Sequence, residues 1–230
     1  MMKRTLYAAV GHFRCKRDSM GRSYPVVVVN RKENLMDMQE MMVWTALCWR
    51  VSDFTERERK YDALAVGLPA PGRTLEFCLE RLQTRGLIAC GQGDTDFDAL
   101  YDLLGGLYVV PVSERLSLRL ITVLKLMLFR GVSWRTARIL FHRDRRDDRE
   151  AQVMALSKQA LLSVAELVKC AEVGVEDVST DRKLLDALYD DADSTSANLS
   201  FTMRGAASAK PDTMAVANLY LRKQIVLERL

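Results

Sequence analysis

The chain has 230 residues, of which 49% are hydrophobic and 28% are charged, an ordinary globular composition that suits one or two domains. No apolar run approaches the roughly 18–20 residues that a membrane helix needs. Five widely spaced cysteines without a Cys-x-x-Cys pair argue against a disulfide framework or a zinc site. We therefore expect a cytoplasmic protein that has no metal, no cofactor and no membrane partner.

The net charge of +4 is unevenly distributed along the chain. Segments 1–90 and 115–149 carry net charges of +5 and +7, whereas segments 91–114 and 150–230 carry −5 and −3. Basic stretches attract phosphate backbones, and alternation in sign can confine that attraction to one face. A solvated surface with charges of both signs is the other interpretation, and both stay open at this point.

The first elements are predicted to be strands, at residues 4–10 and 24–30. The second of them is a run of valines, which favours a buried strand. A polar loop that contains Gly21 separates the two strands, and pairing of the two as a hairpin is one option despite the length of this connection.

Three helices and a short strand are predicted to follow. Asp37 is typical of a helix N-cap, and Thr55 with Glu58 forms a capping-box pattern. Gly86 is suited to the left-handed position after a helix. The expected elements are helices at 38–50, 55–66 and 71–85 and a strand at 87–90.

The second half is predicted to be mainly helical. An acidic helix at 94–104 and a strand at 107–112 come first, and Ala- and Leu-rich periodic patterns follow. We expect helices at 116–129, 134–141, 150–171, 180–189 and 213–228, with a polar loop at 190–212.

The stretch from Tyr61 to Ile88 resembles the helix-turn-helix and wing entry of winged-helix bacterial transcription regulators. Small and apolar residues carry the resemblance, and they stand at Leu64-Ala65, Thr74-Leu75, Leu79, Leu82 and Arg85-Gly86-Leu87-Ile88. Leu75, Leu79 and Leu82 recur at helical spacing, so they form one buried stripe. The resemblance implies that the third helix enters the major groove of DNA.

Candidate DNA contacts lie on that third helix and on a second basic stretch. Arg73, Thr74, Phe77 and Arg81 are candidates for phosphate or base contacts on the third helix. Arg135 and Arg138 follow a Gly-x-Ser turn that is also typical of helix-turn-helix units. Internal ion pairing is the competing explanation for the second stretch, since aspartates interrupt it.

The segment at 92–98 departs from the pattern of winged-helix regulators. The wing of those regulators is basic, whereas the aspartates of this segment would repel phosphate. This acidic segment favours an alternative function, a winged-helix protein-protein interaction module that docks a partner through residues 94–110. No phosphate-binding glycine loop, nucleophile elbow or histidine pair is present, so we do not expect an enzyme.

These features together predict a mainly α protein with small β elements. A winged helix-turn-helix domain with an N-terminal β-hairpin is expected at 1–112, and a helical domain for dimerisation or sensing at 113–230. The expected function is that of a DNA-binding transcriptional regulator of winged-helix type, acting as a homodimer on double-stranded DNA. The interaction module remains the alternative.

Overall fold

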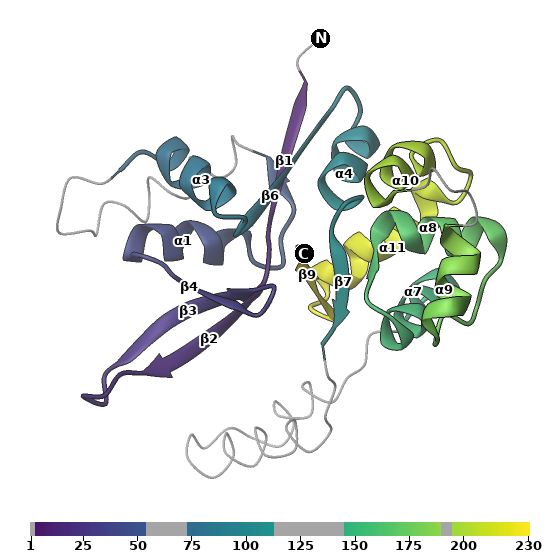
Figure 1. Cartoon of the computed structure of the whole chain (residues 1–230). Helices are drawn as coiled ribbons and strands as arrows, with labels where there is room; N and C mark the ends of the chain where they lie inside the picture. Colours follow the sequence, from purple (N-terminus) through teal and green to yellow (C-terminus); the bar gives the residue numbers. More distant parts are fainter. Residues whose placement is uncertain (1–2, 54–72, 113–144, 190–194) are drawn as a thin grey trace.

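The computed structural model describes residues 3–53, 73–112, 145–189 and 195–230, and Figure 1 shows their arrangement. Helices account for 46% and strands for 23% of this part, and the strands form three antiparallel sheets of three strands each. The protein is therefore a mixed α/β protein, and the prediction of a mainly α fold with small β elements was wrong. The expected helices at 55–66, 116–129 and 134–141 lie outside the described residues.

The first sheet has the strand order β5-β1-β6. Its strands are antiparallel and run over Arg4–Ala9 (β1), Ser52–Asp53 (β5) and Ile88–Gly93 (β6). The second sheet has the order β2-β3-β4 and is formed by His12–Arg17 (β2), Ser23–Val29 (β3) and Lys32–Leu35 (β4). The predicted strands at 4–10 and 24–30 are thus confirmed as β1 and β3, but they belong to different sheets and do not pair.

Two helices pack together beside the first sheet (Figure 1). They are Met38–Leu47 (α1) and Leu75–Thr84 (α3). The predicted N-cap Asp37 is confirmed, and its side chain accepts a hydrogen bond from the Glu40 N–H. Gly86 ends α3 with a φ of 69°, the left-handed conformation expected of it. Helix α3 begins at Leu75, later than predicted, because the side chain of Thr74 caps it.

Helix α4, Asp96–Leu104, lies against β6 with almost no space between the two backbones. Strand β6 has glycines at two positions that face the helix, Gly91 and Gly93. A Cβ atom added at Gly91 would lie 2.2 Å from the Leu103 nitrogen, and one at Gly93 would lie 2.3 Å from the Ala99 nitrogen. The alternation of glycine in β6 is therefore what permits the helix to approach the strand.

The third sheet and the remaining helices make up the other side of the molecule. The sheet has the order β8-β7-β9, from Tyr108–Pro111 (β7), Leu162–Ser163 (β8) and Ile225–Glu228 (β9). The helices are Asp148–Gln159 (α7), Val164–Val173 (α8), Asp181–Leu188 (α9), Ser196–Met203 (α10) and Ala209–Leu221 (α11). The predicted helix at 180–189 is confirmed as α9.

Two long helices of the prediction are interrupted in the structure. The expected helix at 150–171 is divided into α7 and α8 by β8, because Ser163 and Glu166 form a capping box that starts a new helix. The expected helix at 213–228 ends at Leu221, and its last residues form β9. The expected loop at 190–212 contains α10 and the start of α11.

A winged helix is not supported by this topology. The predicted wing begins at β6, but β6 pairs with the N-terminal strand β1 and then leads into α4. Strand β7, the next along the chain, pairs instead with β8 and β9. The fold-class prediction was therefore wrong in its architecture as well as in its helix content.

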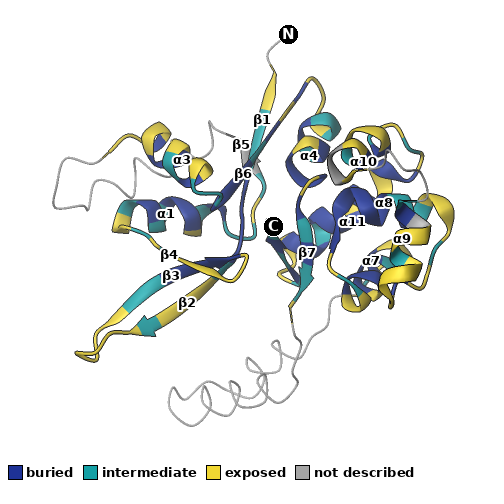
Figure 2. Ribbon diagram, in the orientation of Figure 1, coloured by how far each residue is buried: buried dark blue, intermediate teal, exposed yellow. Residues whose placement is uncertain are grey.

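One apolar core extends across both sides of the molecule, as the dark blue segments of Figure 2 indicate. Buried Tyr220 of α11 connects the sides, because its hydroxyl accepts from the Trp49 N–H at 3.0 Å and lies 3.2 Å from the Ala9 carbonyl. The indole of Trp44 donates to the carbonyls of Val10 and Leu87.

The predicted division of the chain into two domains near residue 112 stays a prediction. The third sheet joins β7, which precedes that residue, with β8 and β9, which follow it.

Within the described ranges, every helix is too short or too polar to cross a lipid bilayer.

Candidate nucleic-acid interface

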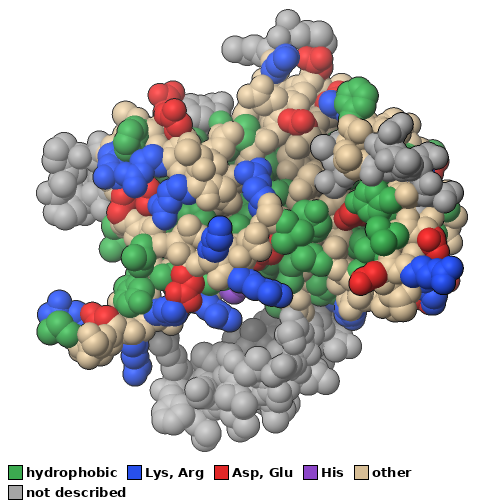
Figure 3. Space-filling view, in the orientation of Figure 1, with side chains coloured by type: hydrophobic (Ala, Val, Ile, Leu, Met, Phe, Trp, Pro, Cys, Tyr) green, Lys and Arg blue, Asp and Glu red, His purple; other side chains and the backbone are tan. Residues whose placement is uncertain are grey.

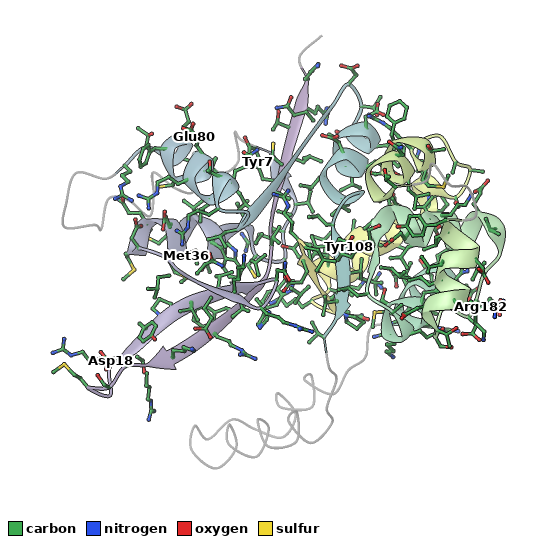
Figure 4. The ribbon with its side chains drawn as sticks, viewed as in Figure 1. Tyr7, Asp18, Met36, Glu80, Tyr108 and Arg182 are labelled. Carbon is green, nitrogen blue, oxygen red and sulfur yellow. The ribbon has the colours of Figure 1, made fainter. Side chains whose placement is uncertain are left out.

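The β2–β3–β4 sheet forms an arm that projects from the rest of the protein (Figures 1 and 4). Its pairing is regular, from His12 opposite Val28 to Arg17 opposite Ser23. Strand β4 pairs only with the inner part of β3, from Val26 to Val29. The outer part is therefore a two-stranded ribbon of β2 and β3, and the labelled Asp18 stands at its far end in Figure 4.

Asp18 closes the tip of this ribbon. Its carboxylate accepts hydrogen bonds from the Met20 N–H at 2.9 Å and the Arg22 N–H at 2.7 Å. Its backbone N–H donates to the Arg22 carbonyl, and its carbonyl accepts from the Gly21 N–H. Gly21 has a φ of 77°, which glycine adopts without strain. The tip is therefore an ordered turn in which the Asp18 carboxylate is hydrogen-bonded to backbone N–H groups.

Positive charge dominates the arm, residues 12–35. Two acids, Asp18 and Glu33, stand against six cations, which are Arg14, Lys16, Arg17, Arg22, Arg31 and Lys32. Lys16 pairs with Glu33 at 2.5 Å, and the hydrogen bond to this carboxylate raises the pKa of Lys16. The other five cations form no ion pair with the residues that the structure describes. Lys and Arg atoms follow the arm at the lower left of Figure 3.

The base of the arm is fixed to strand β9. Gly11 stands between β1 and β2 with a φ of 84°, and its N–H donates to the Leu227 carbonyl at 2.7 Å. The Glu228 carboxylate accepts from the Asn30 N–H at 3.1 Å and lies 3.5 Å from Nδ1 of His12. A Cβ atom at Gly11 would lie 2.4 Å from the Val28 carbonyl oxygen. These contacts hold the arm at a fixed place on the body of the protein.

The turn between β3 and β4 is strained at Arg31. Asn30 and Arg31 have φ values of 46° and 61°, both in the left-handed region. A two-residue turn of this kind favours glycine at its second position, because a side chain there costs about 1 kcal/mol or more. Arg31 is exposed and forms no ion pair among the described residues, so no ion pair there offsets the strain.

We expect Arg31→Gly to raise the free energy of unfolding by about 1 kcal/mol, because glycine adopts this turn without strain. The same change removes one of the five unpaired cations of the arm, so we expect it to weaken nucleic-acid binding. Chemical denaturation measures the first effect and fluorescence anisotropy the second. Asn30→Gly in the same turn is the control, since it changes the backbone and leaves the charge. A lower free energy of unfolding in Arg31→Gly would contradict the inference that the turn is strained at Arg31.

The four predicted recognition residues run from just before α3 to its last turn, and two of them, Arg73 and Arg81, meet acids at the start of α1. Arg73 pairs with Asp37, and Arg81 lies 2.9 Å from the Glu40 carboxylate. Thr74 is the N-cap and accepts a hydrogen bond from the Phe77 N–H. The side chains of Arg73 and Arg81 therefore meet acids of the same chain. The role of Arg73, Thr74, Phe77 and Arg81 in contacting DNA stays a prediction.

Phe77 lies between two guanidinium groups on the outer face of α3. The Arg73 and Arg81 guanidinium carbons lie 5.6 and 5.9 Å from the centre of its ring. The ring is 44% exposed, so Phe77 is not a core residue. A cation over an aromatic face is a stabilising contact, worth roughly 0.5–1 kcal/mol at an exposed site.

Glu40 is the centre of the contact between α1 and α3. It is 1% exposed, and one carboxylate oxygen accepts from Arg85 at 2.9 Å while also closing the capping box at Asp37. Arg85 further donates to the Leu35 carbonyl at the end of the arm.

Burial alone would raise the pKa of Asp37, but hydrogen bonds from the Glu40 N–H and the Arg73 guanidinium outweigh it and lower the pKa.

The second predicted basic site is described only at its end. Arg135 and Arg138 lie outside the described residues, so they stay predictions. The arginines that follow meet groups of α11 and its neighbourhood: Arg146 donates to the Gln224 side chain at 2.5 Å, and Arg149 lies 3.4 Å from buried Asp212. Arg149 thus forms an ion pair within the chain, as the competing explanation expects, whereas the group that Arg146 meets on Gln224 is a neutral amide.

The acidic segment expected to dock a partner has other contacts. Asp96 pairs with Arg4 at the start of β1, and Asp98 pairs with Arg204 at 2.8 Å. Asp102 accepts a hydrogen bond from the Gln92 N–H. Two of the aspartates at the N-terminal end of α4 therefore bind arginines of this chain, which weakens the segment as a surface that attracts basic partners.

The sequence predicts a loop over residues 12–17, so the cations of the arm are not among the predicted site residues. In strand β2 only Phe13 and Cys15 alternate with polar residues, and both are exposed because β2 lies at the edge of the sheet, so the strand pattern is short and weak. The available signal was the Asp-x-x-Gly turn at 18–21 between the basic segment and the valine run.

Comparison of the chain with models of protein families, with curated proteins and with solved structures finds no match.

Proposed function

We propose that the protein binds double-stranded DNA and that the arm makes the principal phosphate contacts. The observation that carries the proposal is the concentration of five cations on one projecting arm, all without an ion pair among the described residues. They are Arg14, Arg17, Arg22, Arg31 and Lys32. The role in transcription control and the homodimer, both expected from the sequence, stay predictions.

The contrast with the arginines around α1, α3 and α11 supports this choice of surface. Arg73, Arg81 and Arg85 each meet a carboxylate of α1, and Arg149 and Arg222 meet buried acids. A cation that already has a partner gains less from a phosphate, because the first pair must be broken or shared. The five unpaired cations of the arm have no such cost, and they stand close together on one projecting element, so they are well placed to exchange small counterions for phosphates.

The shape of the arm also suits a nucleic acid. The six residues of β2 span about 20 Å at roughly 3.3 Å per residue. Ribbons and small sheets are among the elements that enter the grooves of duplex DNA. The Glu228 contacts at the base hold the ribbon in place, so less conformational freedom is lost on binding.

The test is fluorescence anisotropy with a short random-sequence DNA duplex across a series of salt concentrations. The arm variant carries Arg14→Gln, Arg17→Gln and Arg22→Gln. The matched control carries three substitutions on the helices of the other side, and these are Lys158→Gln, Lys169→Gln and Lys210→Gln. Each set removes three positive charges, so the overall charge of the two variants is the same.

We expect the arm variant to bind more weakly and with a shallower salt dependence. Each phosphate contact contributes roughly 0.9 to the slope of log K against log salt, so loss of three contacts lowers the slope by about 2–3. The control should keep the slope of the natural protein. Equal slopes in the two variants would mean that net charge alone matters and would exclude the arm. No binding at low salt by the natural protein would favour the protein-interaction alternative.

A further inference from the structure

The tip of the arm presents a large apolar side chain to solvent. Met20 is 74% exposed, and it stands within the turn that the Asp18 carboxylate closes. The tip lies at the far end of the projecting arm, where Asp18 is labelled in Figure 4. An apolar side chain at such a position gains nothing from the fold, because it buries little surface there.

The surroundings of Met20 are suited to a nucleic acid. Arg17 and Arg22 flank the turn on its two sides, and neither forms an ion pair among the described residues. The nearest acid in the sequence, Asp18, has its carboxylate turned to backbone N–H groups. An apolar tip between two cations therefore matches a duplex, in which apolar base steps lie between two rows of phosphates.

We propose that Met20 is a wedge that inserts between adjacent base pairs from the minor groove and kinks the duplex, while Arg17 and Arg22 hold the flanking phosphates. This inference rests on the proposed DNA binding and adds the form of DNA that the protein takes, a bent duplex. Apolar wedges of this kind unstack one base step and bend DNA by about 20–90°. Because the turn is already ordered in the free protein, little backbone conformational freedom is lost when Met20 inserts.

The experiment measures bending and affinity separately. A DNA duplex with a donor dye at one end and an acceptor dye at the other reports bending by energy transfer, and anisotropy with the same duplex reports affinity. Three variants of the full chain are compared, and they are Met20→Ala, Met20→Leu and Met38→Ala. Met38 is 70% exposed and lies on α1 away from the tip, so it controls for the loss of an exposed methionine.

We expect the natural protein to raise the energy transfer at saturation, and Met20→Ala to abolish this rise. Its affinity should change by less than about tenfold and its salt slope should stay the same, since the lost contact also removes the cost of unstacking. Met20→Leu and Met38→Ala should bend DNA like the natural protein.

Three results would overturn the wedge while DNA binding stands. The first is a rise in energy transfer with Met20→Ala that equals that of the natural protein, and the second is a loss of this rise in Met38→Ala as large as in Met20→Ala. The third is a natural protein that binds DNA without any rise in energy transfer. Absence of binding in the anisotropy measurement would instead remove the proposed function, so the two failures are distinct. The far-ultraviolet circular dichroism of each variant confirms that the compared proteins are folded.

Discussion

Replacing Gly91 with alanine is expected to lower the free energy of unfolding by at least about 3 kcal/mol, the upper end for overpacking a well-filled core. The added Cβ would lie 2.2 Å from the Leu103 nitrogen and 2.4 Å from the Ala99 carbonyl oxygen, both in the backbone of α4. A flexible side chain could turn away, whereas a helix backbone moves only as a whole. Chemical denaturation measures the loss.

The control for Gly91 is Gly106→Ala. Gly106 follows α4, is exposed and has no heavy atom within 4 Å of an added Cβ. We expect this change to leave the free energy of unfolding within about 0.5 kcal/mol of the natural value, as for most surface substitutions. If the two variants were equally stable, β6 and α4 would not be in the close contact that the structure gives them.

Replacing Glu40 with glutamine should cost about 3 kcal/mol of stability, the lower end of the range for breaking a buried ion pair. The lower end applies because the side chains of Arg81 and Arg85 are 41% and 29% exposed and can reach water when Glu40 loses its charge. The carboxylate is itself buried and contacts both arginines and the Asp37 N–H. Its loss therefore affects the capping of α1 and the packing of α1 on α3 together.

Glu76→Gln provides the comparison for Glu40→Gln. Glu76 lies on the exposed side of α3 and forms no ion pair among the described residues, so we expect a change of less than about 0.5 kcal/mol. Thermal unfolding of the two variants under one set of conditions measures both effects. Equal midpoints would contradict the central role of Glu40 between the two helices.

These variants separate the stability of the fold from the function of the arm. Gly91 and Glu40 lie in the packing of the first sheet and its helices, whereas Arg14, Arg17 and Arg22 lie on exposed positions of the ribbon. The changes in the arm should therefore alter DNA affinity without altering the unfolding midpoint by more than a small amount. A weakly binding arm variant that is also unstable would not count as support for the interface.

Local signals made part of the fold predictable. Asp37 with Glu40 begins α1 where the sequence indicated, and Gly86 ends α3 for the conformational reason expected of it. The valine run of β3 and the acidic helix α4 were also located correctly. Each of these signals acts between residues a few positions apart, so the chain carries it without reference to the rest of the fold.

The pairing of strands decided much of what the prediction missed. The winged helix failed because β6 pairs with β1, and the hairpin of β1 and β3 failed because β3 pairs with β2 and β4. The signal that divides α7 from α8 was present at Ser163 and Glu166, but the continuous apolar periodicity on both sides obscured it.

By itself the sequence determined where some helices and strands begin, among them α1, α9 and β3, the basic character of the segment around the arm, and the residues of α3 that form its buried stripe. Only the tertiary structure decided which charges are neutralised. Arg81 is 41 positions from Glu40, and Arg73 is 36 positions from Asp37, and each pair meets because α1 packs on α3. Of the cations of the arm, Lys16 alone meets an acid among the described residues, Glu33 of the same arm, and the other five meet none because the arm projects away from the body (Figure 1). Electrostatic partners depend on distance in space, which the order of residues does not fix.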